Sequence, residues 1–187
     1  ARGIRPDVLV INLFLADTFR HHLLSSLQAH GLDMDPQSLQ SLPHADKPAF
    51  LSALVDAIHA VRPDVPVYVA ITVDGATRAP LATHLHLTGL AARVGRTPAD
   101  ELQRNVQDRF RLDSLSHDWY AETHISTRPV VKRLNGNYAY PMMTLALSLD
   151  THDSVGARRC RDLALRVARD SGDAHLLTQV KSRLGVD

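Results

Sequence analysis

Two histidines one residue apart are the most chemically suggestive feature of the sequence. They stand in residues 83–88, which read Thr-His-Leu-His-Leu-Thr. On a β-strand His84 and His86 would point to the same face, as a two-histidine metal site requires. On a helix, which Pro80 and the later Gly95 would suit, the two imidazoles would diverge by roughly 200°. With 11 histidines in the chain, chance alone yields roughly 0.6 such pairs, so structural or surface histidines are the competing interpretation.

Parts of this region resemble two families of enzymes that act on phosphate esters. The element 84–86, His-Leu-His, is similar to that of single-strand nucleases that bind a divalent metal and attack with tyrosine, for which Tyr120 would be the nucleophile. The elements 86–88 and 124–126, His-Leu-Thr and His-Ile-Ser, resemble the paired motifs of two-histidine phosphoesterases. The second resemblance implies that the histidine of each motif exchanges protons with a phosphodiester while the hydroxyl supports the phosphate.

The only cysteine stands among cations. Arg158, Arg159 and Arg161 surround Cys160 in the sequence, and neighbouring cations lower a thiol pKa and make the sulfur more nucleophilic. On a helix, however, Cys160 would lie one turn from Leu163 and share its inward stripe. A packed small residue with solvated arginines beside it is therefore the competing interpretation.

Composition excludes several classes of protein. The chain has 187 residues, is 44% hydrophobic, and carries 21 Lys and Arg against 20 Asp and Glu, a net charge of +1. This balance gives no strong nucleic-acid signal and argues against a polybasic membrane-surface protein, although a local patch of either kind is left open. A single cysteine and the lack of any apolar run of about 18–20 residues indicate a cytoplasmic, non-membrane protein. Because the first residue is Ala1, we also expect a processed start or a domain of a larger protein.

Two apolar runs predict buried strands in the first half of the chain. Residues 8–15 and 65–73 are almost all apolar, with many Val, Ile and Leu. Such runs are typical of strands in parallel sheets, which are buried on both faces. Between them Asp46 and Pro48 predict the start of a helix that Pro63 ends. A strand, helix and strand in this order predict a right-handed crossover.

The second half of the chain is expected to be helical. Residues 97–100, Thr-Pro-Ala-Asp, are typical of a capping box before a helix through Leu102, Val106 and Phe110. Residues 138–149 predict another helix. A helical hairpin is expected to follow, with one helix capped by Asp153 or Ser154, the next ending near Leu184, and Gly172 between them. The predicted fold class is therefore α/β, with a small parallel sheet, crossover helices and a helical C-terminal half, in a single domain whose α/β part covers residues 1–95 and whose mainly helical part covers 96–187.

The N-terminal part resembles the strand–helix–strand centre of the SGNH hydrolases over residues 5–73. In that family a strand ends in Gly-x-Asn-Asp, whose Asn contributes to the oxyanion hole. The matching tetrad is Phe14-Leu15-Ala16-Asp17, which keeps the family residue only at Asp17 and is not preceded by a Gly-Asp-Ser nucleophile block. The resemblance implies a parallel α/β fold and ester hydrolysis.

These patterns lead to two hypotheses of function. The first is a hydrolase or group-transfer enzyme acting on an ester or phosphoester, with Asp17, His84, His86 and His124 as its catalytic groups near the carboxyl ends of the strands. The cofactor is unknown, and no metal ligand is assigned. The alternative is a non-catalytic protein-interaction or regulatory domain that uses its C-terminal helices, with an unknown small molecule or protein as partner. An enzyme would bring together at least two of Asp17, Asp74, His84, His86, His117 and His124 around one pocket.

Overall fold

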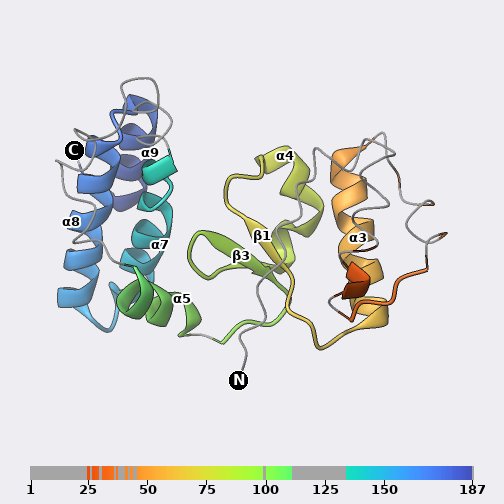
Figure 1. The fold of residues 1–187 in the computed structure, drawn as a ribbon. Helices are drawn as coiled ribbons and strands as arrows, with labels where there is room; N and C mark the ends of the chain where they lie inside the picture. Colours follow the sequence, from red (N-terminus) through yellow and green to blue (C-terminus); the bar gives the residue numbers. More distant parts are fainter. Residues whose placement is uncertain are drawn as a thin grey trace. The chain divides into compact units, whose positions relative to one another are not determined.

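The chain folds into two compact units, each with a hydrophobic core of its own (Figure 1). The structure is a computed structural model that describes Ser25 and residues 27–29, 31–35, 37, 41, 43, 46–98, 100–110 and 134–186, apart from the side chain of Arg109. Of the described residues, those up to Tyr68 and Val73–Leu85 form the N-terminal unit, and Val69–Thr72 and those from His86 onward form the C-terminal unit. The single domain divided at residue 95 stays a prediction, since compactness alone does not define a domain.

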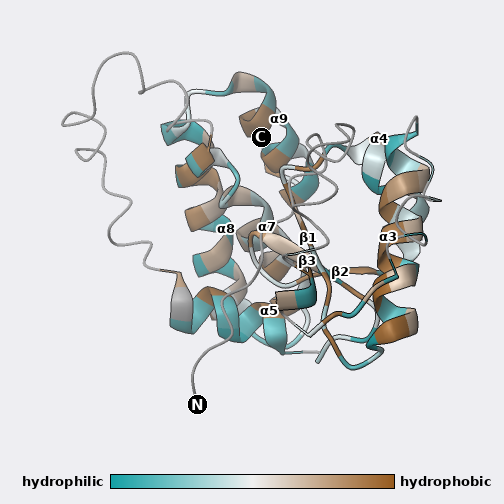
Figure 2. Cartoon of the chain, turned by 45° about the vertical axis from the view of Figure 1, so that its right-hand side comes forward, coloured by the Kyte–Doolittle hydropathy of each residue, from teal (hydrophilic) through white to brown (hydrophobic). Residues whose placement is uncertain are grey.

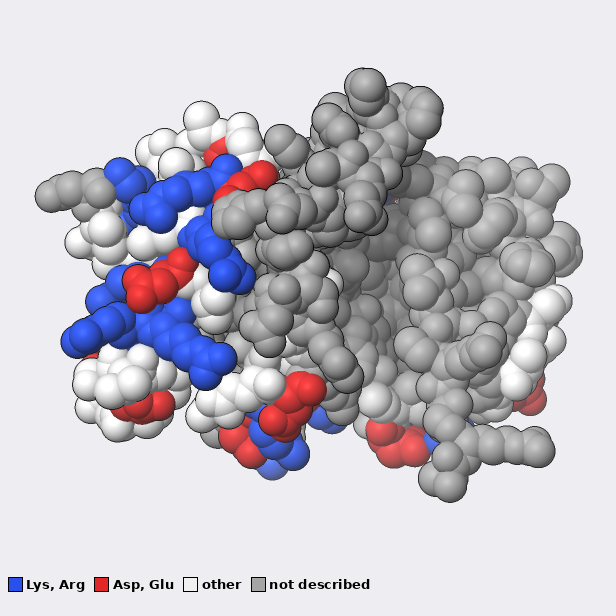
Figure 3. All heavy atoms as spheres, turned by 60° about the vertical axis from the view of Figure 1, so that its left-hand side comes forward, with Lys and Arg blue, Asp and Glu red and all other residues white. Residues whose placement is uncertain are grey.

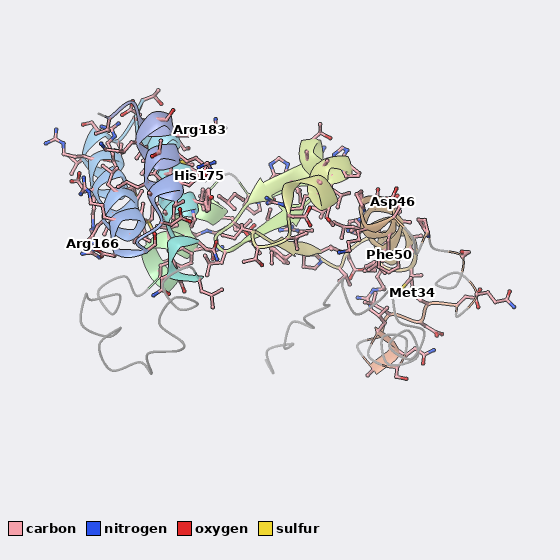
Figure 4. The ribbon with its side chains drawn as sticks, turned by 90° about the horizontal axis from the view of Figure 1, so that it is seen from above. Met34, Asp46, Phe50, Arg166, His175 and Arg183 are labelled. Carbon is pink, nitrogen blue, oxygen red and sulfur yellow. The ribbon has the colours of Figure 1, made fainter. Side chains whose placement is uncertain are left out.

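The N-terminal unit is built on helix α3 (Lys47–Val61), which begins and ends as the sequence predicts. The Asp46 carboxylate accepts a hydrogen bond from the Ala49 amide at 3.4 Å, and Pro48 lies in the first turn. Helix α4 (Gly75–Arg78) and the 3₁₀ helix η2 (Ala79–His84) pack against α3. The core of the unit, which includes Met34 and Phe50 as labelled in Figure 4, consists of Leu27, Leu32, Met34, Phe50, Leu54 and Ile58.

Three short strands form an antiparallel sheet. The strands are β1 (Tyr68–Ala70), β2 (Leu85–Leu87) and β3 (Ala91–Val94), in the spatial order β1-β3-β2. The turn between β2 and β3 is closed by the Thr88 amide, which donates to the Ala91 carbonyl at 2.9 Å. Gly89 in this turn has a φ of +152°, a conformation that residues with a side chain rarely adopt.

The predicted parallel sheet with crossover helices is therefore wrong. Of the apolar run 65–73 only Tyr68–Ala70 is a strand, and its neighbour is β3; the expected partner, residues 8–15, lies outside the described residues. Pro66 has no amide to donate to a sheet, and Asp74 caps helix α4, so the strand is short at both ends. Within β1 only the central residue is buried, a one-sided pattern that belongs to antiparallel sheets and not to strands covered on both faces.

The three C-terminal helices confirm the prediction for that part of the chain. Helices α7 (Ala139–Leu149), α8 (Ser154–Asp170) and α9 (Ala174–Leu184) pack against one another (Figure 1). The Asp153 carboxylate accepts from the Gly156 amide at 2.9 Å and caps α8, while Asp173 caps α9. Their shared core consists of Ala139, Met142, Met143, Leu145, Ala146, Leu149, Ala157, Cys160, Ala164, Leu165, Val167, Ala168, Leu176, Val180 and Leu184, together with Val106 from the preceding segment.

The helix predicted after the capping box exists, but it begins later. Helix α5 (Glu101–Arg104) is followed by a π-helical turn (Asn105–Arg109), and the cap residue is Asp100, whose side chain makes no capping hydrogen bond. The predicted Thr97 cap is wrong because the first helical turn opens with the Arg104 amide donating to the Asp100 carbonyl at 2.9 Å. The Asn105 side-chain amide then donates to the Thr88 carbonyl at 2.6 Å, which ties this segment to the β2–β3 turn.

Among the described helices, none combines the length and the apolar character needed to span a membrane.

Candidate functional site

The histidine pair does not lie on one strand or on one helix. His84 is the last residue of η2, and His86 is the central residue of β2. The backbone changes from 3₁₀ to extended at Leu85, which has φ −88° and ψ 120°. Both imidazoles are exposed, and the two residues belong to different units. Neither geometry considered from the sequence therefore applies to the pair.

The other two predicted catalytic residues, Asp17 and His124, lie outside the described residues, as does His117. The catalytic roles of Asp17, His84, His86 and His124 therefore stay predictions. In the part of the chain that the structure describes, no group of three or more His, Cys, Asp or Glu side chains is arranged to hold a metal ion.

Asp74 has a structural role at the start of α4. Its Oδ1 accepts from the Thr77 amide at 2.9 Å, and its Oδ2 accepts from the Thr77 hydroxyl at 2.7 Å. These hydrogen bonds lower the pKa of Asp74, because both favour the charged carboxylate. A carboxylate held ionised in a helix cap is poorly suited to exchange protons with a substrate near neutral pH.

The C-terminal unit has an open hollow of about 260 Å³, and the side chains that line it carry only amide, hydroxyl and hydrocarbon groups. Its lining residues are Ile71, Thr72, Leu90, Leu134, Asn135, Asn137 and Tyr138. Asn135 is buried, whereas Leu134 is 51% exposed. No carboxylate, imidazole or cation is among the lining residues, so the hollow offers no acid/base pair.

Cys160 lies on the buried side of α8 and is 7% exposed. Burial raises the pKa of its thiol, and Asp153 acts in the same direction, while Arg159 opposes them. At neutral pH the sulfur is therefore protonated. The burial and the raised pKa agree with Cys160 as a packed small residue and not with Cys160 as an activated nucleophile.

The outward side of α8 carries a group of charged side chains. Five arginines stand in this helix against two aspartates. Its inward residues are buried, which leaves the arginines on the solvent side; Figure 2 shows hydrophobic and hydrophilic residues alternating along α8, as expected of such a helix. Helix α8 (Ser154–Asp170) therefore carries a net charge of +3, although the whole chain carries only +1.

Three of these arginines form what we name the α8 arginine face: Arg158, Arg159 and Arg169. All three are exposed, and none has an ion pair or side-chain hydrogen bond within the described part of the chain. At 3.6 residues per turn they lie within about 100° of one another around the helix and span about 16 Å along it. Figure 3 shows several Lys and Arg side chains close together on one face, with Asp and Glu side chains among them.

The two remaining arginines of α8 are placed differently. Arg161 donates from Nη2 to the Asp150 carboxylate at 3.2 Å. Arg166 is partly buried, and Figure 4 shows it on α8, with Arg183 and His175 on α9. The sequence analysis identified these arginines only as a solvated face beside Cys160. The signal that it missed is the uneven distribution of charge along the chain, which the total of +1 conceals.

Comparison with known proteins found no match to this chain among protein-family models, curated proteins or solved structures. The resemblance to SGNH hydrolases therefore stays a prediction, while the parallel sheet that it implied is corrected by the observed topology.

Proposed function

We propose that this chain is a non-catalytic binding domain that contacts an anionic macromolecule through the α8 arginine face. The observation that carries the proposal is the set of three exposed guanidinium groups without a carboxylate partner in the described residues. Exposed charges of one sign attract a partner of the opposite sign over distances of about 10 Å at moderate ionic strength.

The backbone beneath these arginines is well anchored. Ala164 and Ala168, on the opposite side of α8, are fully buried, and the helix is capped by Asp153. A helix held in this way presents its outward side chains from a rigid base, so less conformational entropy is lost on binding than with a loop.

The hydrolase hypothesis receives no comparable support from the described residues. His84 ends η2 and His86 lies in β2, Asp74 serves as a helix cap, and the hollow in the C-terminal unit has no acid/base pair. The binding hypothesis is therefore the one that the described geometry favours.

The proposal is tested by removing the three charges and measuring retention on a sulfated polysaccharide matrix. We expect the triple variant Arg158→Gln, Arg159→Gln and Arg169→Gln to elute at clearly lower salt than the wild type. The matched control removes three exposed cations elsewhere, Lys47→Gln, Arg96→Gln and Arg104→Gln. Elution of both triple variants at the same salt concentration would contradict the proposal, because net charge alone would then explain retention. Circular dichroism checks that both variants keep their helices.

A further inference from the structure

We infer that the partner of the α8 arginine face is duplex nucleic acid, contacted through its phosphates without reading of the bases. The inference rests on the proposed function, because it identifies the chemical class of the occupant. It depends on which chemical groups the face offers, on which it lacks, and on how the groups are spaced.

Every cation of α8 is an arginine, which suits phosphate recognition. The planar guanidinium presents paired N–H donors that match two oxygens of one phosphate or carboxylate, whereas a lysine ammonium acts as a point charge. Duplex DNA carries one negative charge per about 1.7 Å of its axis, so a face of about 16 Å meets several phosphates at once. Arg158, Arg159 and Arg169 can therefore each contact a phosphate, whatever the base sequence of the duplex.

A membrane surface fits this helix poorly. A helix that binds at a membrane interface inserts an apolar side between the lipid headgroups. The apolar side of α8 is instead used by the protein core, where Ala157, Ala164 and Ala168 are at most 1% exposed. Only its charged side is left for a partner.

An acidic protein is also disfavoured. Protein interfaces gain most of their affinity from a few aromatic, Met or Arg anchors in a desolvated centre. The outward side of α8 supplies arginines but no aromatic residue or Met, and its one large exposed apolar residue, Val155, lies in the first turn, so an apolar centre that would desolvate such anchors is missing. Interfaces with nucleic acid are more polar and more positively charged, which matches this composition.

The lack of aromatic residues on the outward side of α8 also favours a duplex over a single strand. Proteins that hold single strands stack the bases on aromatic side chains beside a basic groove. The α8 arginine face offers cations without an aromatic residue beside them, and such cations suit the regular phosphate array of a duplex. Contacts of this kind carry no sequence information.

One acidic residue lies within the proposed contact surface. Asp162 is exposed and stands between the arginines, about one turn from Arg158. Its carboxylate repels phosphate and reduces the local positive charge. Asp162→Asn is therefore expected to tighten binding severalfold, a gain that damage to the fold could not produce.

Fluorescence anisotropy with a labelled duplex of about 20 base pairs tests the inference. We expect the full chain to bind two duplexes of unrelated sequence equally, with a dissociation constant on the order of 10⁻⁶–10⁻⁴ M at physiological salt. The logarithm of the affinity should fall with the logarithm of the salt concentration with a slope of about −3, and the α8 triple variant should lose most of this slope. The Lys47/Arg96/Arg104 control should retain it.

Two comparison probes separate the possible outcomes. If an oligoglutamate peptide at the same charge concentration binds through α8 and the duplex does not, the inference is overturned while the proposed function stands. If neither probe shows binding that depends on the α8 arginines, both fail. Tighter binding of the matching single strand than of the duplex, or an unchanged affinity in Asp162→Asn, also overturns the inference.

Discussion

At the scale of single residues, hydrogen bonding to a neighbour explains the clearest electrostatic effect in the described chain. Asp64 receives two parallel hydrogen bonds from Arg62, from Nε to Oδ1 at 2.9 Å and from Nη2 to Oδ2 at 2.8 Å. These bonds lower the pKa of Asp64 from 3.8 to about 2. Because the folded-state pKa is depressed, the pair stabilises the fold above the unfolded-state pKa, and this contribution is lost as the pH falls toward 2. Both side chains are exposed, so solvent screening keeps the effect on stability small.

We expect Arg62→Gln to return the pKa of Asp64 toward its ordinary value, because the charged donor that stabilises the carboxylate is removed. The measurement is an NMR titration of the Asp64 carboxyl carbon. Arg104→Gln serves as the control, since Arg104 pairs with Asp100 at 3.0 Å and not with Asp64. An Asp64 midpoint that stays near 2 in Arg62→Gln would show that the guanidinium is not the cause.

At the scale of elements, an aspartate side chain caps the start of four of the described helices, α3, α4, α8 and α9. Asp46, Asp74, Asp153 and Asp173 each accept a hydrogen bond from a first-turn amide that the helix itself leaves unpaired. At α8 the geometry also explains a glycine, since a Cβ at Gly156 would overlap the Asp153 carboxylate. The capping hydrogen bond therefore depends on the carboxylate of Asp153 and on the lack of a side chain at Gly156.

Asp153→Ala is expected to lower the free energy of unfolding by about 1 kcal/mol, because the Gly156 amide loses its partner at the end of a packed helix. Urea denaturation followed by circular dichroism measures the change. Asp150→Ala is the control: it removes an aspartate from the same loop that pairs with the partly exposed Arg161, and since the Asp150 side chain is itself 60% exposed we expect a smaller loss of about 0.3 kcal/mol. Equal losses in the two variants would mean that the cap contributes nothing beyond its charge.

At the scale of the whole molecule, two hydrophobic cores stabilise two compact units. The core around Phe50 and the core around Leu149 share no residue, and both side chains are 2% exposed. A cavity made in one core removes van der Waals contacts from that core alone. The helices that depend on each core should therefore lose stability separately.

We expect Phe50→Ala to reduce the hydrogen-exchange protection of α3 by the equivalent of about 3–5 kcal/mol and to leave α7, α8 and α9 protected. Leu149→Ala should do the reverse, with a loss of about 2–5 kcal/mol in the C-terminal helices. Mass spectrometry of exchanged peptides gives both readouts from one sample. Loss of protection in all four helices from either substitution would show that the units unfold together.

The sequence by itself determined the helices α3, α7, α8 and α9, because their signals are local. A cap such as Asp153, the repeat of buried residues every three or four positions and a terminator such as Gly172 all lie within one stretch of chain. It also determined that Cys160 faces inward, since that follows from the same repeat.

The tertiary structure alone decided how the strands pair and which charges are left exposed. Residues 68–70 pair with residues 91–94, and the choice of a strand partner depends on contacts between distant segments that no local pattern encodes. The backbone changes from 3₁₀ to extended at Leu85, between His84 and His86, because β2 begins there and pairs with β3. Likewise, the sequence of α8 contains five arginines, but only the packing of the helix shows that Arg158, Arg159 and Arg169 remain exposed.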